Sequence, residues 1–302
     1  MRAYVNLKYI DEIARAGSIR RAAELLSITP SALNRRLLAI EDELNVQIFE
    51  RLPRGVRLNA AGEILLQHIR EQFSDFERVQ SQIADLSGIR RGKISIACSQ
   101  ALLPFFLPNQ IDRYRTEYPT VQFRVLPRDR AEAEISLSDF SADLALIFEP
   151  ISRSDFHAII SVRQSIYAVM DRDHPLAALE SLRLRDCIQY PLALPSKPYG
   201  VRNLFEQALV KLGQSVTPSL ESDSFEFLRM SISGTKLITF QIEVGLEAND
   251  AGERLISRPI SSSDIANGLL HLGQLRGRVL SVAASKFATQ LAQTMFERYE
   301  LP

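Results

Sequence analysis

Polar side chains that could read DNA bases gather in one short stretch of the sequence. Ser31, Asn34 and Arg35 fall on one side when residues 30–44 are wound at about 100° per residue as a helix. Asparagine can pair with adenine in the major groove, and arginine can bind guanine or a phosphate. Arg36 adds a second positive charge nearby. This face predicts DNA recognition, and an ordinary solvated helix surface is the alternative.

The elements around this stretch are arranged as a reading helix requires. The opposite side of the predicted helix carries the apolar residues Leu33, Leu37, Ile40 and Leu44. Thr29 can cap the helix start, and Pro30 suits the first helical position. A preceding helix, capped by Ser18, is joined to it by a three-residue turn at 27–29. Two helices connected in this way predict a helix-turn-helix.

A second basic element follows the predicted reading helix. Residues 49–58 have apolar flanks around the turn Pro53-Arg54-Gly55, which predicts a hairpin with Arg54 at its tip. A basic side chain at such a tip can reach a phosphate or the minor groove. Arg51 and Arg57 can support it. We therefore predict a winged helix-turn-helix DNA-binding domain over residues 1–60, with Ser31, Asn34, Arg35, Arg36, Arg51 and Arg54 as candidate DNA contacts.

The charge balance limits how such a protein can bind DNA. The chain has 302 residues, with 36 Lys and Arg against 36 Asp and Glu, so its formal net charge is zero. A polybasic coat protein is excluded. Residues 1–60 nevertheless hold ten basic and seven acidic side chains. This modest local excess predicts moderate, salt-sensitive non-specific affinity.

Other classes of protein find little support in the sequence. Neither GxGxxG nor GxSxG occurs, and the two cysteines and four histidines lack metal-ligand spacing. Cys98 ends an apolar run, which is typical of a small buried residue. No apolar stretch approaches the roughly 18 residues of a membrane span. We therefore identify no catalytic residue, expect no metal and no cofactor, and expect a cytoplasmic protein without a signal peptide.

Residues 61–88 contain no proline and predict one long helix. Its apolar residues alternate at spacings of four and three, with Gln72 as a polar interruption: Leu65, Ile69, Phe76, Val79, Ile83 and Leu86. The mean spacing of about 3.5 is the period of a coiled-coil seam. The pattern favours a linker and dimerisation helix, and packing against the same chain is the alternative.

The remaining residues alternate between strand and helix patterns, which predicts an α/β sheet. The predicted strands are 93–98, 122–126, 143–148, 165–170, 192–194, 236–240 and 278–283. The predicted helices include a stretch ending near 118 and the segments 131–140, 200–212, 225–233 and 286–299.

The segment 4–66 resembles, without gaps, the DNA-binding domain of the LysR-type transcriptional regulators. The most specific matches are Ala22-Ala23, Ser31-Ala32, Arg35, 39–41, Leu44, 49–51, Gly55 and Ala61-Gly62. Asn45 stands where the family usually has glycine, and asparagine tolerates the left-handed conformation that such a turn needs. Asn34 and Pro30 stand where Ser and Gln are common. Both lie on the reading helix, so they leave the operator sequence open.

Residues 92–302 resemble the effector domain of the same family, although less densely. The resemblance implies an α+β multidomain protein: a winged helix-turn-helix, a long linker helix, and a two-lobed α/β periplasmic-binding-protein-like effector domain. Lobe 1 would comprise about 92–163 and 268–302, and lobe 2 about 164–267. The chain would cross between the lobes near 160–162 and 266–269.

A ligand of this fold should lie between the lobes, near strand ends and helix N-termini. The candidate effector-binding residues are Ser99, Gln100, Arg128, Phe148, Ser196, Lys197, Tyr199, Arg202 and Phe240. The basic and aromatic members suit an anionic or aromatic ligand. A simple helix cap for Ser99, core packing for Phe148 and surface solvation for Lys197 are the alternatives.

The leading hypothesis is a dimeric or tetrameric regulator that binds double-stranded DNA at an inverted-repeat operator. A small-molecule effector would shift its population of conformations and so change its DNA binding. One alternative is an enzyme or transport-type binding protein built on the two-lobed fold. Another is a DNA-binding regulator whose lobes serve only for oligomerisation and bind no ligand.

Overall fold

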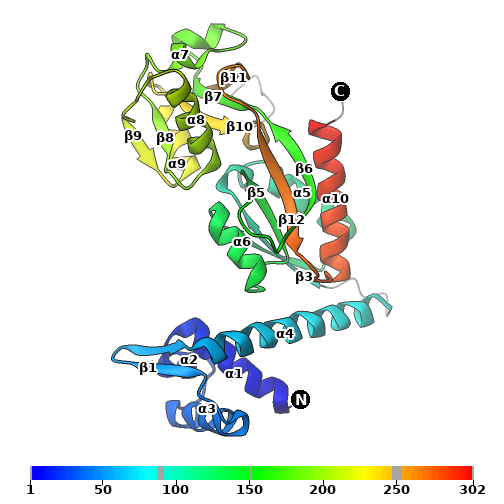
Figure 1. The fold of residues 1–302 in the computed structure, drawn as a ribbon. Coiled ribbons are helices and arrows are strands. Elements are labelled where there is room, and N and C mark those ends of the chain that lie inside the picture. The colour runs from blue at the N-terminus through cyan, green and yellow to red at the C-terminus, as the bar shows by residue number, and fades with distance from the viewer. Residues whose placement is uncertain (1, 87–91, 150, 247–253, 301–302) are drawn as a thin grey trace. The chain divides into compact units, whose positions relative to one another are not determined.

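A computed structural model describes residues 2–86, 92–149, 151–246 and 254–300. The chain forms two compact units, Met1–Val79 and Gln80–Pro302 (Figure 1). The long helix α4 (Ala60–Leu86) belongs to both units. Residues 87 and 88 of the predicted linker helix lie outside the described residues.

The N-terminal unit is the predicted winged helix-turn-helix. Helices α1 (Arg2–Ala16), α2 (Ile19–Leu25) and α3 (Pro30–Leu44) precede the hairpin of β1 (Phe49–Leu52) and β2 (Gly55–Leu58). Ser18 Oγ accepts a hydrogen bond from the Arg21 N–H, and Thr29 Oγ1 accepts one from Ala32. The predicted caps are therefore confirmed.

The buried face of α3 fixes its rotation. Leu33 and Leu37 are buried, together with Ile10 and Ile13 of α1. Leu44, by contrast, is 45% exposed although it falls on the same apolar side of the helix. It is the last helical residue before Asn45, which turns the chain with a left-handed φ of 52°. The prediction that asparagine adopts the left-handed conformation at this position, in place of the usual glycine, is confirmed.

The apolar row of α4 divides into two parts. Leu65 and Ile69 pack into the core of the N-terminal unit. Phe76, Val79 and Ile83 are 46%, 40% and 59% exposed. The alternative of packing within the same chain therefore holds for the first part of the row. The exposed part keeps the spacing of a seam, and its role in dimerisation stays a prediction.

Lobe 1 of the C-terminal unit is built on a five-stranded sheet of order β4-β3-β5-β12-β6. Its strands are β3 (Gly92–Cys98), β4 (Val121–Pro127), β5 (Leu144–Phe148), β6 (Phe156–Gln164) and β12 (Gly268–Leu275). β3 runs parallel to β4 and β5, whereas β12 pairs antiparallel with β5 and β6.

Helices cover both faces of this sheet, as buried strands require. One face packs against α5 (Phe106–Glu117) and α10 (Val282–Tyr299) through residues such as Ile96 and Leu146. Ala97 and Ala145 face the other way and meet α6 (Arg130–Ser138). Cys98 is buried, which confirms the prediction made for this residue. Burial raises the pKa of its thiol to about 12.

Lobe 2 contains two smaller sheets. The first has the antiparallel order β10-β7-β11, with β7 (Ile166–Asp171), β10 (Thr239–Ile242) and β11 (Leu255–Pro259). The second pairs β8 (Ala193–Pro195) with β9 (Leu220–Ser222) in parallel. The helices are α7 (Leu184–Cys187), α8 (Gly200–Lys211) and α9 (Phe225–Ile232). Short 3-10 turns are η1 (Gln100–Leu102), η2 (Pro175–Ala178) and η3 (Glu243–Gly245).

Two segments join the lobes (Figure 1). β6 ends at Gln164 and β7 begins at Ile166, so the first crossing lies at Ser165, beyond the expected 160–162. The return runs between β11 and β12. The predicted strand at 278–283 is wrong, because Ser281 caps α10 and that helix begins at Val282. Across the described ranges, no helix is long and apolar enough to span a membrane.

Candidate nucleic-acid interface and effector cleft

The structure places the predicted reading residues on the outer side of α3. Ser31 and Arg35 are exposed, and Asn34 is half-buried. Arg36 is also exposed, but its guanidinium carbon lies 5.1 Å from the ring centre of Tyr9 on α1. Arg36 therefore flanks the outer face, and Ser31 and Arg35 are its outermost polar members.

The hairpin is held tightly against the helices. Leu52 pairs with Gly55, so Pro53 and Arg54 form a two-residue turn with Arg54 exposed. Val56 N donates to Gly17 O at 2.9 Å. Gly55 has a φ of +126°, and a Cβ there would lie 2.3 Å from the same oxygen. Only glycine fits this approach, which fixes the position of the wing.

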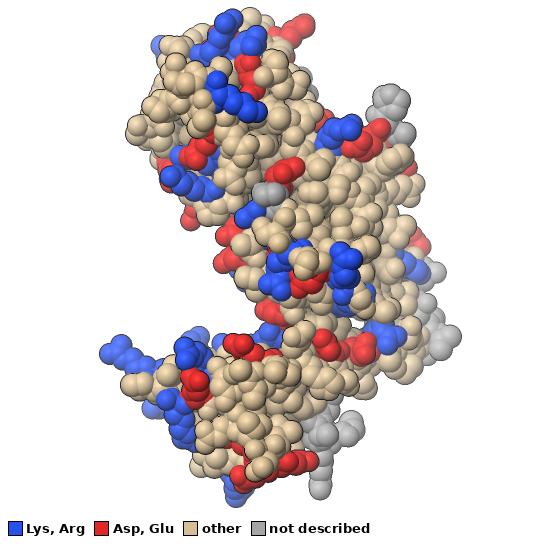
Figure 2. Space-filling view, in the orientation of Figure 1, with Lys and Arg blue, Asp and Glu red and all other residues tan. Residues whose placement is uncertain are grey.

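The two faces of the hairpin carry different arginine contacts. Arg57 Nη2 pairs with Glu50 Oε2 at 2.7 Å, and the Glu50 carboxylate raises the pKa of Arg57. Arg51 Nη2 instead donates to Asn34 Oδ1 of α3 at 3.0 Å. Figure 2 shows Lys and Arg side chains gathered over the hairpin end of this unit. The wing and the reading helix thus form one basic surface.

A small cavity of about 20 Å³ lies between the two lobes of the C-terminal unit. Four predicted effector residues line it, namely Ser99, Arg128, Phe148 and Tyr199. The other lining residues are Ala101, Asp129, Arg130, Ala133, Leu146, Ile147, Pro198, Gly200, Val201, Phe225 and Ile242. A space of this size holds about one water molecule.

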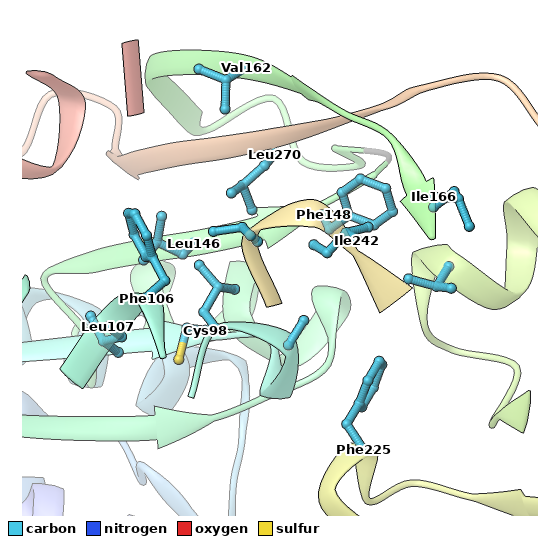
Figure 3. Close-up of a cluster of buried hydrophobic side chains, with 14 of the residues drawn as sticks. Cys98, Phe106, Leu107, Leu146, Phe148, Val162, Ile166, Phe225, Ile242 and Leu270 are labelled. Carbon is cyan, nitrogen blue, oxygen red and sulfur yellow. The ribbon is translucent and has the colours of Figure 1, made fainter. Parts of the chain in front are cut away.

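Phe148 explains why the cavity is small. Its side chain is only 5% exposed, and it lies with Ile242 and Ile166 where the lobes meet (Figure 3). A Cβ on Gly200 would lie 2.8 Å from Phe148 Cδ1, and one on Gly268 would lie 2.3 Å from Cζ. The two glycines therefore make room for the ring. The Phe148 ring lines the cleft and also packs in the core.

Polar groups approach the cavity from both lobes. Gln100 Nε2 of lobe 1 donates to Tyr199 Oη of lobe 2 at 3.2 Å. Burial raises the pKa of the Tyr199 hydroxyl. Arg128 is exposed, and its Nη1 donates to the backbone oxygen of Pro127 at 3.4 Å. Ser99 Oγ accepts a hydrogen bond from the Ala101 N–H at 3.4 Å, as a helix cap does.

The N-terminus of α8 faces the same cavity, because Gly200 and Val201 line it. Tyr199, at the cap position, makes no side-chain hydrogen bond to the helix amides. The first N–H groups of a helix have no partner within the helix and carry a partial positive charge. Together with Arg128, this arrangement suits an anion.

Several predicted effector residues lie elsewhere. Arg202 is buried, and its Nε and Nη1 bind Glu206 and Glu221, so its charge is already neutralised within lobe 2. Phe240 packs against Phe205 in the core, with ring centres 4.7 Å apart. We correct the expectation for these two residues accordingly. Ser196 and Lys197 directly precede the lining residue Pro198 but do not line the cavity themselves, and their role in effector binding stays a prediction.

Sequence reasoning missed some lining residues. Asp129 caps α6 by accepting the Glu132 N–H at 2.8 Å, and an aspartate before a helical pattern could have indicated this site. Phe225 and Ile242 gave no such sign, because their approach depends on how the lobes pack. In the described part of the chain, no group of His, Cys, Asp and Glu could hold a metal ion.

Two family models match the chain. Residues 5–63 match the bacterial regulatory helix-turn-helix protein of the lysR family, and residues 87–296 match the LysR substrate binding domain. The HTH-type transcriptional regulator YbhD of Escherichia coli (strain K12) is 31% identical over 197 residues. That match covers 65% of this chain and 62% of the relative.

Solved structures share the fold at lower sequence identity. Full-length CbnR complexed with its target DNA is 16% identical with a TM-score of 0.64, covering 96% of this chain and 99% of that one. The effector binding domain of QuiR in complex with shikimate is 15% identical with a TM-score of 0.58. It covers 69% of this chain and 99% of its own.

Proposed function

This chain belongs to the LysR family of transcriptional regulators, and we propose that it is a ligand-controlled DNA-binding regulator. The helix α3 and the β1–β2 hairpin would bind the operator. The cleft between the lobes would bind a small-molecule effector. The observation that carries the proposal is one chain holding both a basic winged helix-turn-helix and a cleft lined from two lobes.

The operator contacts follow from exposure and charge. Ser31 and Arg35 lie on the outer face of α3, where a recognition helix meets base edges. Arg54 at the hairpin tip would contact a phosphate or the minor groove. Arg36 would bind the DNA backbone from the flank. The small basic excess of this unit predicts moderate affinity for non-specific DNA.

The cleft favours a small anionic effector. Arg128, the uncapped N-terminus of α8 and the Tyr199 hydroxyl would hold a carboxylate or a similar group. The aromatic walls Phe148 and Phe225 would pack against its carbon skeleton. Solved QuiR, which shares this fold, is in complex with shikimate, and this supports a small molecule as the ligand class.

Effector binding would change the relative position of the lobes. The cavity of about 20 Å³ has room for about one water, so an organic acid enters only when the lobes separate. Separation breaks the Gln100–Tyr199 hydrogen bond. A ligand that stabilises the separated arrangement shifts the population of conformations and thereby alters DNA binding.

The exposed apolar row Phe76, Val79 and Ile83 on α4 would pair two subunits. A two-fold dimer presents two reading helices, and this favours an inverted-repeat operator. A tetramer would join two such dimers. CbnR, a full-length relative by fold, is complexed with its target DNA, which supports DNA as the partner.

We assign no catalytic role to this chain. The one carboxylate in the cavity lining, that of Asp129, caps α6 by accepting the Glu132 N–H, and the related protein YbhD is named a transcriptional regulator. Because its proposed partner is DNA, we place the protein in the cytoplasm.

Ligand-dependent footprinting tests the proposal. DNA fragments bound by the protein would be digested with and without members of a library of small organic acids. At least one acid should change the protected region, and Arg128→Gln should raise the concentration it requires. If no acid changes the footprint, the lobes serve only as an oligomerisation scaffold and the regulatory half of the proposal fails.

A further inference from the structure

A hydrogen bond between the reading helix and the wing changes the role of Asn34. Arg51 Nη2 donates to Asn34 Oδ1 at 3.0 Å. An arginine side chain has donors and no acceptor, so the amide atom that faces it must be the carbonyl oxygen. The amide nitrogen Nδ2 of Asn34 then points away from Arg51.

This arrangement ties the amide of Asn34 to the wing and limits how it can turn toward a base. Bidentate recognition of adenine needs the amide oxygen to accept from N6 and the amide nitrogen to donate to N7. In this protein the oxygen is already bound to a guanidinium. Its second lone pair remains open, but the bond to the charged donor is a strong one and fixes the direction of the amide. Asn34 is also half-buried, whereas Arg51 is exposed, so Arg51 is the better placed of the two to reach the DNA.

The hairpin holds Arg51 in place for this contact. Arg51 pairs across the strands with Val56, so both side chains lie on the same face of the hairpin. Val56 packs against the core of the N-terminal unit, and its N–H binds Gly17. The face carrying Arg51 is therefore directed toward the helices, whereas Glu50 and Arg57 pair on the other face.

The free donors of Arg51 then become available to DNA. Its guanidinium has five N–H groups, and one nitrogen is used for Asn34. Arg51 is exposed, so the remaining N–H groups can meet acceptor atoms of the DNA. The tether also restricts a long side chain before binding, which lowers the entropy cost of ordering it at the interface.

We propose that Asn34 is a positioning residue that acts through Arg51, and that Arg51 rather than Asn34 contacts the DNA. This inference rests on the proposed function, because it specifies which side chain of the same surface binds the operator. It assigns Asn34 no base preference of its own. The two residues should therefore behave as one unit when either is replaced.

A double-mutant cycle on the full-length protein tests this proposal. The probe is a DNA duplex selected from a random pool by the wild-type protein, and the readout is its affinity for Asn34→Ala, Arg51→Ala and the double variant. Asn34→Ala should weaken binding by about fivefold, and Arg51→Ala by at least about tenfold. The double variant should bind as weakly as Arg51→Ala alone.

Arg35→Ala supplies the matched control, because no hydrogen bond in the described structure joins it to Asn34. Its penalty should multiply with that of Asn34→Ala. A second readout is the base preference of each variant in a random-pool selection. The proposal is overturned if Asn34→Ala still weakens DNA binding about fivefold in the Arg51→Ala background. It is also overturned if Asn34→Ala abolishes a preference for adenine at one position of the selected DNA. Failure of the wild-type protein to select any DNA would instead refute the proposed function.

Discussion

Gln100 and Tyr199 join the two lobes of the effector domain through a hydrogen bond of 3.2 Å. Gln100 opens the 3-10 turn after β3, and Tyr199 precedes α8. The Tyr199 ring also packs edge-on against Phe225, with ring centres 5.0 Å apart. The Tyr199 side chain thus connects the polar and aromatic walls of the cleft. Its removal should weaken both the hydrogen bond to Gln100 and the packing against Phe225.

Tyr199→Phe removes the acceptor of this bond and keeps the ring. We expect it to destabilise the contact between the lobes by about 1 kcal/mol. Amide hydrogen exchange near η1 and at the start of α8 should become up to about fivefold faster. Gln100→Ala should have the same effect. Unchanged exchange in both variants would show that the bond does not hold the lobes together.

Gly268→Ala tests the packing around Phe148. The added Cβ would lie 2.3 Å from Phe148 Cζ, and a Cβ at Gly200 would likewise lie only 2.8 Å from Cδ1. Overpacking of this kind destabilises a protein by about 1–3 kcal/mol, which chemical denaturation would measure. The matched control is the same substitution in a Phe148→Ala background. An equal penalty in both backgrounds would contradict the proposed clash.

Phe76→Asp tests the seam on α4. Phe76 is 46% exposed and lies in the same apolar row as Val79 and Ile83. A charge at this position should convert dimers to monomers in sedimentation, because an unpaired carboxylate is costly in an apolar interface. Gln67→Asp adds the same charge at an exposed position on the opposite side of α4 and should leave the mass unchanged. If the Phe76→Asp variant remains dimeric, the apolar row on α4 does not form the dimer interface.

The stability of the C-terminal unit should depend on two buried histidines. Burial lowers the pKa of His271 below its ordinary value of 6.5, and that of His174 in the same way. The unfolded chain therefore binds more protons than the folded chain near and below pH 6.5, so stability falls as the pH is lowered through that range.

Replacing one of these histidines should flatten the dependence. His271→Gln should show a smaller loss of unfolding free energy between pH 7.5 and about pH 5.5 than the wild type. His157→Gln alters an exposed residue and serves as the control. If His271→Gln retains the wild-type slope, burial of His271 does not contribute to it.

Local patterns predicted the N-terminal unit well, because short-range chemistry determines it. Thr29 and Pro30 mark the start of α3, and Asn45 supplies the left-handed turn at its end. Strands β6 and β12 were harder to predict, since β12 pairs with β5 and β6 from more than a hundred positions away. Within each strand, burial also follows no simple alternation.

The candidate cleft could be predicted only in part. Ser99 was found because it follows the buried strand β3, and Phe148 because it ends the buried strand β5. Arg202 was misplaced, although Glu206 four residues later could have indicated an ion pair within α8. Its second partner, Glu221, belongs to β9 and gave no local sign. Whether an arginine near the start of a cleft-lining helix binds a ligand or a carboxylate depends on tertiary contacts that no short window contains.

Sequencing of the DNA fragments retained by this protein tests whether α3 binds a specific DNA sequence. Genomic fragments would be bound, washed at moderate salt and sequenced for the wild type and for Arg35→Ala. The wild type should enrich an inverted repeat whose half-sites lie about 10 base pairs apart or a multiple of it. Arg35→Ala should lose about 1–3 kcal/mol of affinity for that repeat. Retention of fragments without any shared motif, or equal enrichment by the variant, would contradict sequence-specific binding through α3.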